Sequence, residues 1–307
     1  MPQPLPESAR PCAREANVLD DTGRSPPGLE LLLAVTFALT VFCPRGVDAA
    51  EADKPPASDV QLSKAERHAD GSVGLSIVPI NCLEATVTVN AQLHGLKPSH
   101  PVPWTFVLAG KPEQLDLVPD GSGRGRTHYD VSYLWRPGGI GATHDPQTVY
   151  RLPYPPERHW IVSQGSFGRF SHGEGSGDEY SIDWTMPSGS AVCAARGGRV
   201  IAVKQNSTVN GRGHQFDVDT NYILLRHADG TCGEYLHIET DGATVKVGQE
   251  VEAGQSIGRS GNTGNSSEPH LHFGVFTNID ALTRTSFPIR WQTRNGVTNR
   301  LVEGRTY

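Results

Sequence analysis

The segment Pro269-His270-Leu271-His272-Phe273 (PHLHF) decides how the second half of this 307-residue chain is interpreted. On a β-strand, residues i and i+2 point to the same face of the sheet. His270 and His272 are therefore predicted to project together, while Leu271 and Phe273 face the opposite side, toward a core. Two neighbouring imidazoles on an open face are typical of a metal site or of paired acid/base groups, although surface and structural pairs also occur.

Two further polar patterns precede this strand in the sequence. Asp183 lies between two apolar residues at the edge of a predicted core, with ten residues between it and His172. Because burial of an unpaired charge is costly, the carboxylate needs a partner, which zinc and His172 would supply. Tyr235-Leu236-His237 places two polar side chains at i and i+2, on one face of a predicted strand. The structural alternative for Asp183 is that it caps a turn. The alternative for Tyr235-Leu236-His237 is a strand face exposed to solvent.

Short alternating apolar stretches, together with 34 Gly and 23 Pro, favour strands and turns over helices. In the first half, strands are predicted over residues 85–93, 102–109 and 129–135. In the second half, they are predicted over residues 191–195, 199–203, 222–225, 234–237 and 270–273. The sequence therefore predicts a mainly β protein that begins with a small antiparallel β-sandwich of six or seven strands.

The N-terminus is typical of an export signal. Leu31–Cys43 is an uncharged apolar run of thirteen residues, too short for a membrane span of about 20 residues but suited to a signal peptide. Val47-Asp48-Ala49 offers small residues for cleavage after Ala49. The predicted organisation is a signal peptide at 1–49, a linker at 50–71, a sandwich of unknown role at 72–149 and a second domain at 150–307. The mature protein is expected in the periplasm or the medium, without a membrane span; a buried helix is the alternative for the apolar run.

Composition excludes several classes of partner. The chain is 36% hydrophobic and 20% charged, which indicates a globular protein. With 27 Lys and Arg against 33 Asp and Glu, its net charge of -6 argues against nucleic acid or an anionic membrane as the main partner. Cleavage would leave Cys82, Cys193 and Cys232, which allow either one disulfide between Cys193 and Cys232 or three buried thiols. The sequence leaves the oligomeric state open.

From about Tyr150 to Tyr307 the chain resembles the lysostaphin-type (LytM-like) zinc metallopeptidases, which cut peptidoglycan cross-links. The similarity covers about half of the chain and leaves the N-terminal half unmatched. The motifs that carry it occur in the family's order: 164–165, 171–172, 180–183, 186–192, 194–200, 221–223, 227–230, 235–237, 247–249, 253–258, 260–264 and 269–273. The resemblance implies an antiparallel β-sheet peptidase domain with a substrate groove.

The resemblance also implies a role for each of five residues. His172, Asp183 and His272 correspond to the zinc ligands, and His237 and His270 to the catalytic pair. Three protein ligands leave a fourth tetrahedral position for water, which is the catalytic type of zinc site. Which of the two histidines accepts the proton of that water stays open. Tyr235 could reach the oxyanion or could be a packing residue.

Two features depart from the family's pattern. Ten residues separate His172 from Asp183, where three are common, and Glu268 stands where the family often has glycine. Either could narrow the groove.

The predicted function is zinc-dependent hydrolysis of peptide cross-links or bridges in bacterial peptidoglycan. The alternative is a LytM-like binding module that has no activity of its own and activates a cell-wall amidase. Cupin and carbonic-anhydrase sites fit poorly, because a cupin Glu is missing after His272 and no histidine follows it.

Overall fold

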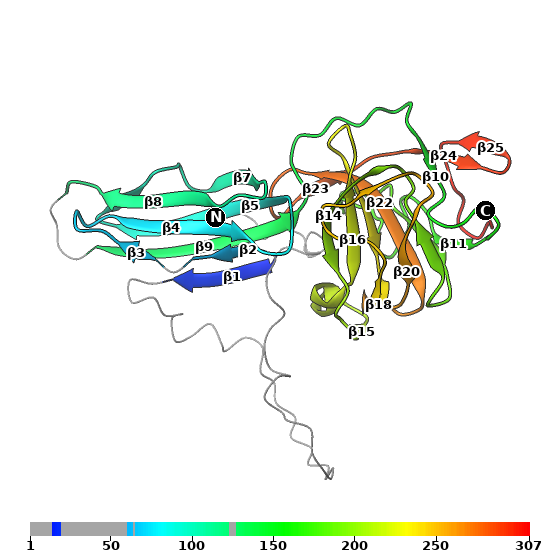
Figure 1. Ribbon diagram of the computed structural model, residues 1–307, viewed down its shortest axis with the longest axis horizontal. Helices are drawn as coiled ribbons and strands as arrows, with labels where there is room; N and C mark the ends of the chain where they lie inside the picture. The colour runs from blue at the N-terminus through cyan, green and yellow to red at the C-terminus, as the bar shows by residue number, and fades with distance from the viewer. Residues whose placement is uncertain (1–13, 20–59, 64, 123–126) are drawn as a thin grey trace, which may run out of the picture.

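The computed structural model describes residues 14–19, 60–63, 65–122 and 127–307, and within them it shows two β-rich domains side by side (Figure 1). The apolar run at 31–43 and the predicted cleavage site at 47–49 lie outside the described residues. Among the described residues the helical structure is the 3₁₀ segment η3 (His214–Asp219). No helix in these ranges is both long enough and apolar enough to cross a bilayer. The prediction of a mainly β protein is confirmed.

The N-terminal domain is a sandwich of two antiparallel sheets. In spatial order, the first sheet consists of β1 (Arg14–Leu19), β9 (His128–Pro137), β5 (Ala85–His94) and β7 (Trp104–Leu108). The second consists of β2 (Val60–Leu62), β4 (Val73–Pro79), β8 (Glu113–Pro119) and β6 (Leu96–Pro98), with β3 (Glu66–Arg67) paired to β4. Strands β2 and β3 precede residue 72 and lie within the segment predicted to be a linker.

The C-terminal domain is organised around an eight-stranded sheet. Its spatial order is β11 (Ile161–Gln164), β12 (Ile182–Thr185), β22 (His270–Asn278), β17 (Cys232–Leu236), β16 (Tyr222–Arg226), β14 (Gly198–Lys204) and β19 (Glu250–Val251), with β23 (Arg284–Ser286) paired to β22.

Three smaller sheets complete this domain. They are β13 (Ala191–Cys193) with β20 (Ser256–Ser260) and β18 (Ile238–Ala243); β10 (Val149–Arg151) with β24 (Arg290–Thr293) and β25 (Gly296–Thr298); and β15 (Asn210–Gly211) with β21 (Gly264–Asn265).

Strand β22 separates a core face from a polar face, as its alternating sequence predicts. Leu271 and Phe273 are fully or almost fully buried in the core of the C-terminal domain. His272 faces the other way and lies opposite Asp183 of the neighbouring strand β12. Because paired residues in an antiparallel sheet project from the same face, this register brings the two predicted metal ligands together.

The two domains share one apolar core at their junction. Tyr222, Leu224 and Phe276 of the C-terminal domain belong to the same buried cluster as Val87 and Trp135 of the sandwich. The backbone also crosses the junction, since the N–H of Leu83 donates to the carbonyl of Ile201 at 2.8 Å. The junction is therefore a packed interface.

All three cysteines of the described chain are buried thiols. Cys82, Cys193 and Cys232 form no disulfide in this structure. Burial raises the pKa of the Cys232 thiol to about 12, so this group stays protonated and unreactive at neutral pH. Of the two predicted alternatives, the structure has three buried thiols and not a disulfide between Cys193 and Cys232.

His227 makes the stability of the C-terminal domain sensitive to acid. Its Nδ1 lies 3.0 Å from the carbonyl of Gly197, and burial lowers the pKa of the ring from 6.5 to about 4. The unfolded chain therefore takes up a proton that the folded protein does not. Above pH 6.5 this difference does not affect the free energy of unfolding, and as the pH falls from 6.5 toward 4 it lowers that free energy. Between pH 7 and 4.5 we expect His227 to cost about 2 kcal/mol.

Urea unfolding at pH 7 and pH 4.5 tests this expectation. The wild type should lose about 2 kcal/mol more of its free energy of unfolding than His227→Gln, which keeps an N–H donor and does not titrate. Equal losses in the two proteins would contradict the assignment.

Candidate metal centre

Three predicted ligand residues converge on one face of the large sheet. The donor atoms of His172, Asp183 and His272 all lie within 4.8 Å of one another, and all three side chains are buried. The Asp183 Oδ1 atom lies 2.9 Å from His272 Nδ1 and 3.4 Å from His172 Nε2. Two imidazole nitrogens and one carboxylate oxygen, drawn together in this way, form a donor set suited to a transition metal.

Hydrogen bonds orient His172 so that a lone pair faces this cluster. Its Nδ1 lies 3.2 Å from the carbonyl oxygen of Gly165, which can only accept, so Nδ1 carries the proton. The other ring nitrogen, Nε2, is then unprotonated when the ring is neutral, and it lies 3.2 Å from His272 Nδ1. A backbone carbonyl that fixes the tautomer in this way is a common support for a metal-binding histidine.

The ten residues between His172 and Asp183 do not separate the two side chains. They form a loop that is closed by local hydrogen bonds, such as the one from the N–H of Ser181 to the carbonyl of Asp178 at 2.9 Å. Gln164 braces the same region, because its Nε2 donates to Asp183 Oδ2 at 2.8 Å and to Ser171 Oγ at 3.0 Å. This amide was not among the predicted site residues.

A buried ion-pair network lies behind His272. Glu234 Oε1 lies 3.5 Å from His272 Nε2, and Arg284 Nη1 donates to Glu234 Oε2 at 2.8 Å. Arg284 also pairs with Asp178 through its other terminal nitrogen. Gly274 makes room for this arrangement, since a Cβ there would stand 2.4 Å from Ser181 Oγ and 3.4 Å from Glu234 Oε1. The network was not predicted.

The network also defines a second possible donor set, Asp178, Glu234 and His272. Its two carboxylates are already bound to the guanidinium of Arg284. A metal ion placed there would meet that positive charge directly. His172, Asp183 and His272 therefore remain the candidate metal ligands, and Glu234 is placed to orient His272.

The charges of the cluster favour a cation. Burial by itself would raise the pKa of Asp183, but the adjacent imidazoles of His172 and His272 hold it well below its usual range. Burial likewise opposes a charge on His272, yet Asp183 and Glu234 raise its pKa to about 10. The same two carboxylates would also favour a metal cation at this position.

The predicted catalytic histidines lie beside this cluster. The ring centroids of His237 and His270 are 4.3 Å apart, and the His237 ring stands perpendicular to that of His272, with 6.4 Å between centroids. His237 is 7% exposed, whereas His270 is more accessible. The Nδ1 of His270 lies 2.8 Å from the carbonyl of Glu268, whose own side chain is exposed.

Tyr235 and His237 do not share a face, contrary to the prediction from their spacing. Strand β17 ends at Leu236, and His237 adopts a left-handed backbone conformation with φ of 63°, which turns its ring toward His270. Tyr235 lies on the core side, where its hydroxyl accepts the N–H of Ala195 at 2.8 Å. Tyr235 is thus a packing residue, and the oxyanion role considered for it is wrong.

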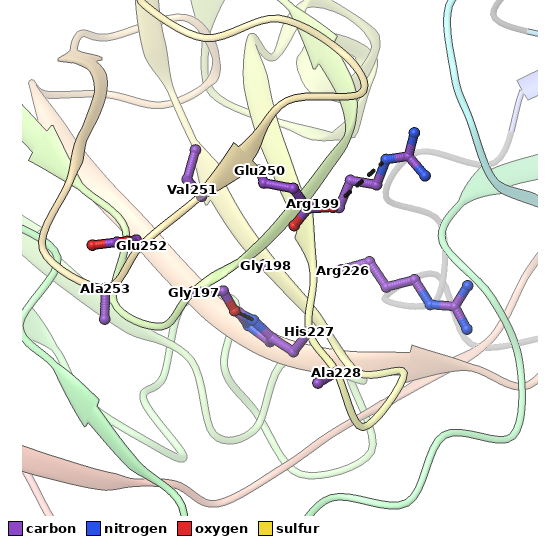
Figure 2. Close-up of a pocket in the computed structure, with 10 residues that line it drawn as sticks. All are labelled: Gly197, Gly198, Arg199, Arg226, His227, Ala228, Glu250, Val251, Glu252 and Ala253. Carbon is purple, nitrogen blue, oxygen red and sulfur yellow. Dashed lines mark hydrogen bonds and ion pairs between the residues drawn. The ribbon is translucent and has the colours of Figure 1, made fainter.

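A separate hollow of about 580 Å³ is lined by residues 197–199, 226–228 and 250–253. Figure 2 shows the residues that line it, with the side chains of Arg199 and Arg226 both extending to the right. None of the five predicted site residues lines it. Its size alone gives no reason to place the chemistry there.

Comparison with known proteins agrees with the geometry. Residues 177–283 match the model of peptidase family M23. This segment is a peptidase family M23 domain. The matched range contains Asp183, His237, His270 and His272. His172 lies just before this range, at the start of the ten-residue loop that leads to Asp183.

Relatives of the M23 domain include named endopeptidases. Glycyl-glycine endopeptidase ALE-1 of Staphylococcus capitis is 36% identical over 113 residues, which are 36% of this chain and 28% of the relative. Peptidoglycan DD-endopeptidase ShyA of Vibrio cholerae is 32% identical over 122 residues, 39% of this chain and 26% of the relative. The chain thus spans about a quarter of the length of these curated relatives.

Among solved structures, the catalytic domain of lysostaphin from Staphylococcus simulans aligns with 47% of this chain and 95% of its own length. The sequence identity is 26% and the TM-score 0.29.

Loss of the negative charge on Glu234 is expected to weaken metal binding by the M23 domain. Glu234→Gln keeps the shape of the side chain but removes the carboxylate that orients His272, and loss of such a partner typically costs about 10–100-fold in metal affinity. Competition with a metal-binding dye measures this affinity directly. Glu250→Gln, at an exposed carboxylate 3.9 Å from Arg199, serves as the control and should bind metal normally. An unchanged affinity in Glu234→Gln would contradict the orienting role.

Proposed function

We propose that the chain is a zinc-dependent endopeptidase that hydrolyses peptide cross-links or bridges of bacterial peptidoglycan. The observation that carries this proposal is the convergence of His172, Asp183 and His272 beside a second pair of imidazoles. Relatives named as a glycyl-glycine endopeptidase and a peptidoglycan DD-endopeptidase support the substrate class. Their names point to different bonds, so both bonds are candidates here.

The donor set fits zinc. His172 Nε2, an oxygen of Asp183 and His272 Nδ1 would hold the ion, and three protein ligands leave a position for water or substrate. When bound, zinc acts as a Lewis acid that polarises a carbonyl and lowers the pKa of water. The contribution of the chain is to hold the donors in place through Gly165, Gln164 and Glu234.

His237 and His270 would move the protons of the reaction. His237 Nδ1 donates to the carbonyl of Thr263 at 2.6 Å, so its Nε2 is the acceptor when the ring is neutral. Burial and the neighbouring His270 lower the pKa of His237, which keeps the ring neutral at neutral pH. His270 is the more accessible ring. One of the two rings would accept the proton of water, and the other would stabilise the oxyanion or protonate the leaving amine.

Two exposed aromatic residues that shortly precede His172 in the sequence would offer a surface for a peptide. Phe170 lies two residues before His172 and is 93% exposed, and Phe167 is 55% exposed. Large apolar side chains that face solvent beside a catalytic cluster commonly contact ligands.

A binding module without activity is the competing function. Such a module has no need for an intact donor set, whereas His172, Asp183 and His272 are all present and oriented in this chain. The complete set favours an enzyme over a regulator of a cell-wall amidase.

Digestion of purified sacculi tests the proposal. Mass spectrometry of the released fragments should show cleaved peptides, and a chelator should abolish the cleavage until zinc is restored. Release of sugar fragments with intact peptides would contradict the peptidase assignment. Binding to sacculi without any cleavage, in protein shown to contain zinc, would favour the binding module.

Action on peptidoglycan requires export, so we propose that the protein works in the periplasm or the medium after removal of residues 1–49. Cleavage after Ala49 would remove β1, which pairs with β9 at an edge of the sandwich. The pairing of β9 with β5 does not depend on β1. N-terminal sequencing of exported protein should begin near Ala50, and intact residues 1–49 on cytosolic protein would contradict export.

A further inference from the structure

One short segment of the chain contacts both histidines of the proposed catalytic pair. The carbonyl of Thr263 accepts a hydrogen bond from His237 Nδ1 at 2.6 Å. Three residues later, Ser266 Oγ lies 3.0 Å from His270 Nδ1. The centroids of the two rings are 4.3 Å apart, so residues 263–266 contact both members of one imidazole pair. Ser266 was not among the residues predicted from the sequence.

The Ser266 hydroxyl is buried and has a proton for only one partner. Ser266 is 4% exposed, and the shortest of its side-chain hydrogen-bond distances is 2.6 Å, from Oγ to Asn262 Oδ1. A hydroxyl group donates one proton and accepts through two lone pairs. Donation to Asn262 therefore leaves the lone pairs of Ser266 Oγ for His270 Nδ1.

The carbonyl of Glu268 determines which nitrogen of His270 carries the proton. This oxygen lies 2.8 Å from His270 Nδ1 and can only accept, so Nδ1 is protonated. The same oxygen lies 3.0 Å from Ser266 Oγ, so two acceptors converge on one ring N–H. Acceptors at Nδ1 restrict rotation of the ring and leave Nε2 of the neutral ring with its lone pair.

Backbone contacts fix Ser266 independently of its side chain. Its N–H donates to the carbonyl of Gly211 at 3.0 Å, and its carbonyl accepts from Asn210 Nδ2 at 3.3 Å. Asn210 and Gly211 form β15, which pairs in parallel with β21. The preceding residue, Asn265, donates through Nδ2 to Asp217 Oδ1 at 2.9 Å. The hydroxyl of Ser266 is therefore presented from a fixed backbone.

The turn that precedes β22 is exposed and gains little support from packing. Ser267, Glu268 and Pro269 all face solvent. Ser266 is the buried residue at the start of this turn, and its Oγ touches both the Glu268 carbonyl and the ring that this carbonyl holds. The Ser266 hydroxyl thus ties an exposed turn, and the imidazole that follows it, to a fixed part of the domain.

We propose that Ser266 is a positioning residue for His270. Its hydroxyl, directed by Asn262, holds the ring beside His237 with Nδ1 protonated and Nε2 available for proton transfer. The inference rests on the proposed function, in which His270 acts on the reacting groups. Ser266 and Asn262 belong to neither candidate donor set, so the contact affects the orientation of a ring and not the binding of metal.

Kinetics of the full-length, zinc-loaded protein test the proposal, with a soluble peptide that carries the bond identified by digestion of sacculi. Ser266→Ala should lower kcat about tenfold, because one orienting hydrogen bond is lost, while KM and metal content stay within about twofold of the wild type. Ser266→Thr restores the hydroxyl and should recover most of the rate. Ser267→Ala removes an exposed hydroxyl from the next residue and should behave like the wild type.

A double-mutant cycle separates positioning from a purely structural role. Ser266→Ala added to His270→Ala should cause no further loss, because the ring through which Ser266 acts is gone. Asn262→Ala, at a half-buried side chain, should also lower kcat, and it tests the same contact if thermal melts show that Ser266→Ala is unfolded. An unchanged kcat in either single variant, or an equal loss from Ser266→Ala with and without His270, would overturn the proposal.

The state of the His270 ring can be read without any turnover. In protein that carries isotope-labelled histidine, long-range proton–nitrogen correlations report the tautomer of each ring, and the His270 signals are those missing from His270→Ala. The wild type and Ser267→Ala should show Nδ1 protonated, whereas Ser266→Ala should show a second tautomer or broadened signals. Unchanged signals in Ser266→Ala would overturn the positioning role. Altered signals in a protein that cleaves no peptide would uphold that role and reject the peptidase proposal alone.

Discussion

Replacing His272 by alanine is expected to empty the metal centre, whereas replacing His270 is expected to leave it loaded but inactive. His272 contributes Nδ1 to the donor cluster, so His272→Ala leaves only two protein ligands and should lose most of the bound metal. His270 is held through Nδ1 by the carbonyl of Glu268, and its loss leaves all three donors in place. Turnover should still fall by about 10²–10⁴-fold, as for a general acid or base.

Elemental analysis beside the rate of peptide cleavage separates the two roles. His237→Ala should resemble His270→Ala, and both His172→Ala and Asp183→Ala should resemble His272→Ala. His128→Ala, at a half-exposed position in the sandwich, should change neither measurement. If His270→Ala empties the site while His272→Ala keeps its metal, the assignment is inverted. If all five variants keep metal and activity, the metal centre lies elsewhere.

Arg284→Met is expected to destabilise the protein by about 3–5 kcal/mol, even without bound metal. Arg284 is the cation between Glu234 and Asp178, and all three side chains are at most 10% exposed. Methionine fills a similar volume but leaves two buried carboxylates without their counter-charge. Burial opposes the charge on Glu234, and Arg284 and His272 together lower its pKa to about 2, so this carboxylate would be the most affected.

Urea unfolding in the presence of a chelator measures this effect apart from metal binding. Arg199→Met is the control, because Arg199 and Glu250 form an exposed pair in which both side chains are more than half accessible. Exposed pairs of this kind contribute about 0–1 kcal/mol. A loss below 1 kcal/mol in Arg284→Met would show that the two carboxylates do not depend on the guanidinium.

Local patterning predicted the strands that carry the site, because a period of two is a property of neighbouring residues. The alternation around His270 and His272 placed both rings on one face, and the apolar neighbours of Asp183 placed this residue on a buried strand. The pairing of β12 with β22, which sets Asp183 opposite His272, joins residues that are far apart in the sequence. The sequence suggested it only through the family resemblance.

The residues that the sequence missed depend on such long-range register. Glu234 lies on the same face as His272 only because β17 pairs with β22. Arg284 reaches Glu234 only because β23 pairs with the C-terminal end of β22. The error over Tyr235 has a local cause. Alternation holds only while the strand continues, and β17 ends one residue before His237, whose backbone turns left-handed.

The apolar core shared by the two domains changes how the protein can be divided. A fragment that begins at residue 150 would expose Tyr222, Leu224 and Phe276, which the sandwich covers in the intact chain. Apolar surface bared in this way promotes aggregation and lowers stability. The sandwich is therefore not an interchangeable module: a hybrid enzyme made by transplanting residues 150–307 onto a different domain would need polar replacements at these positions to remain soluble.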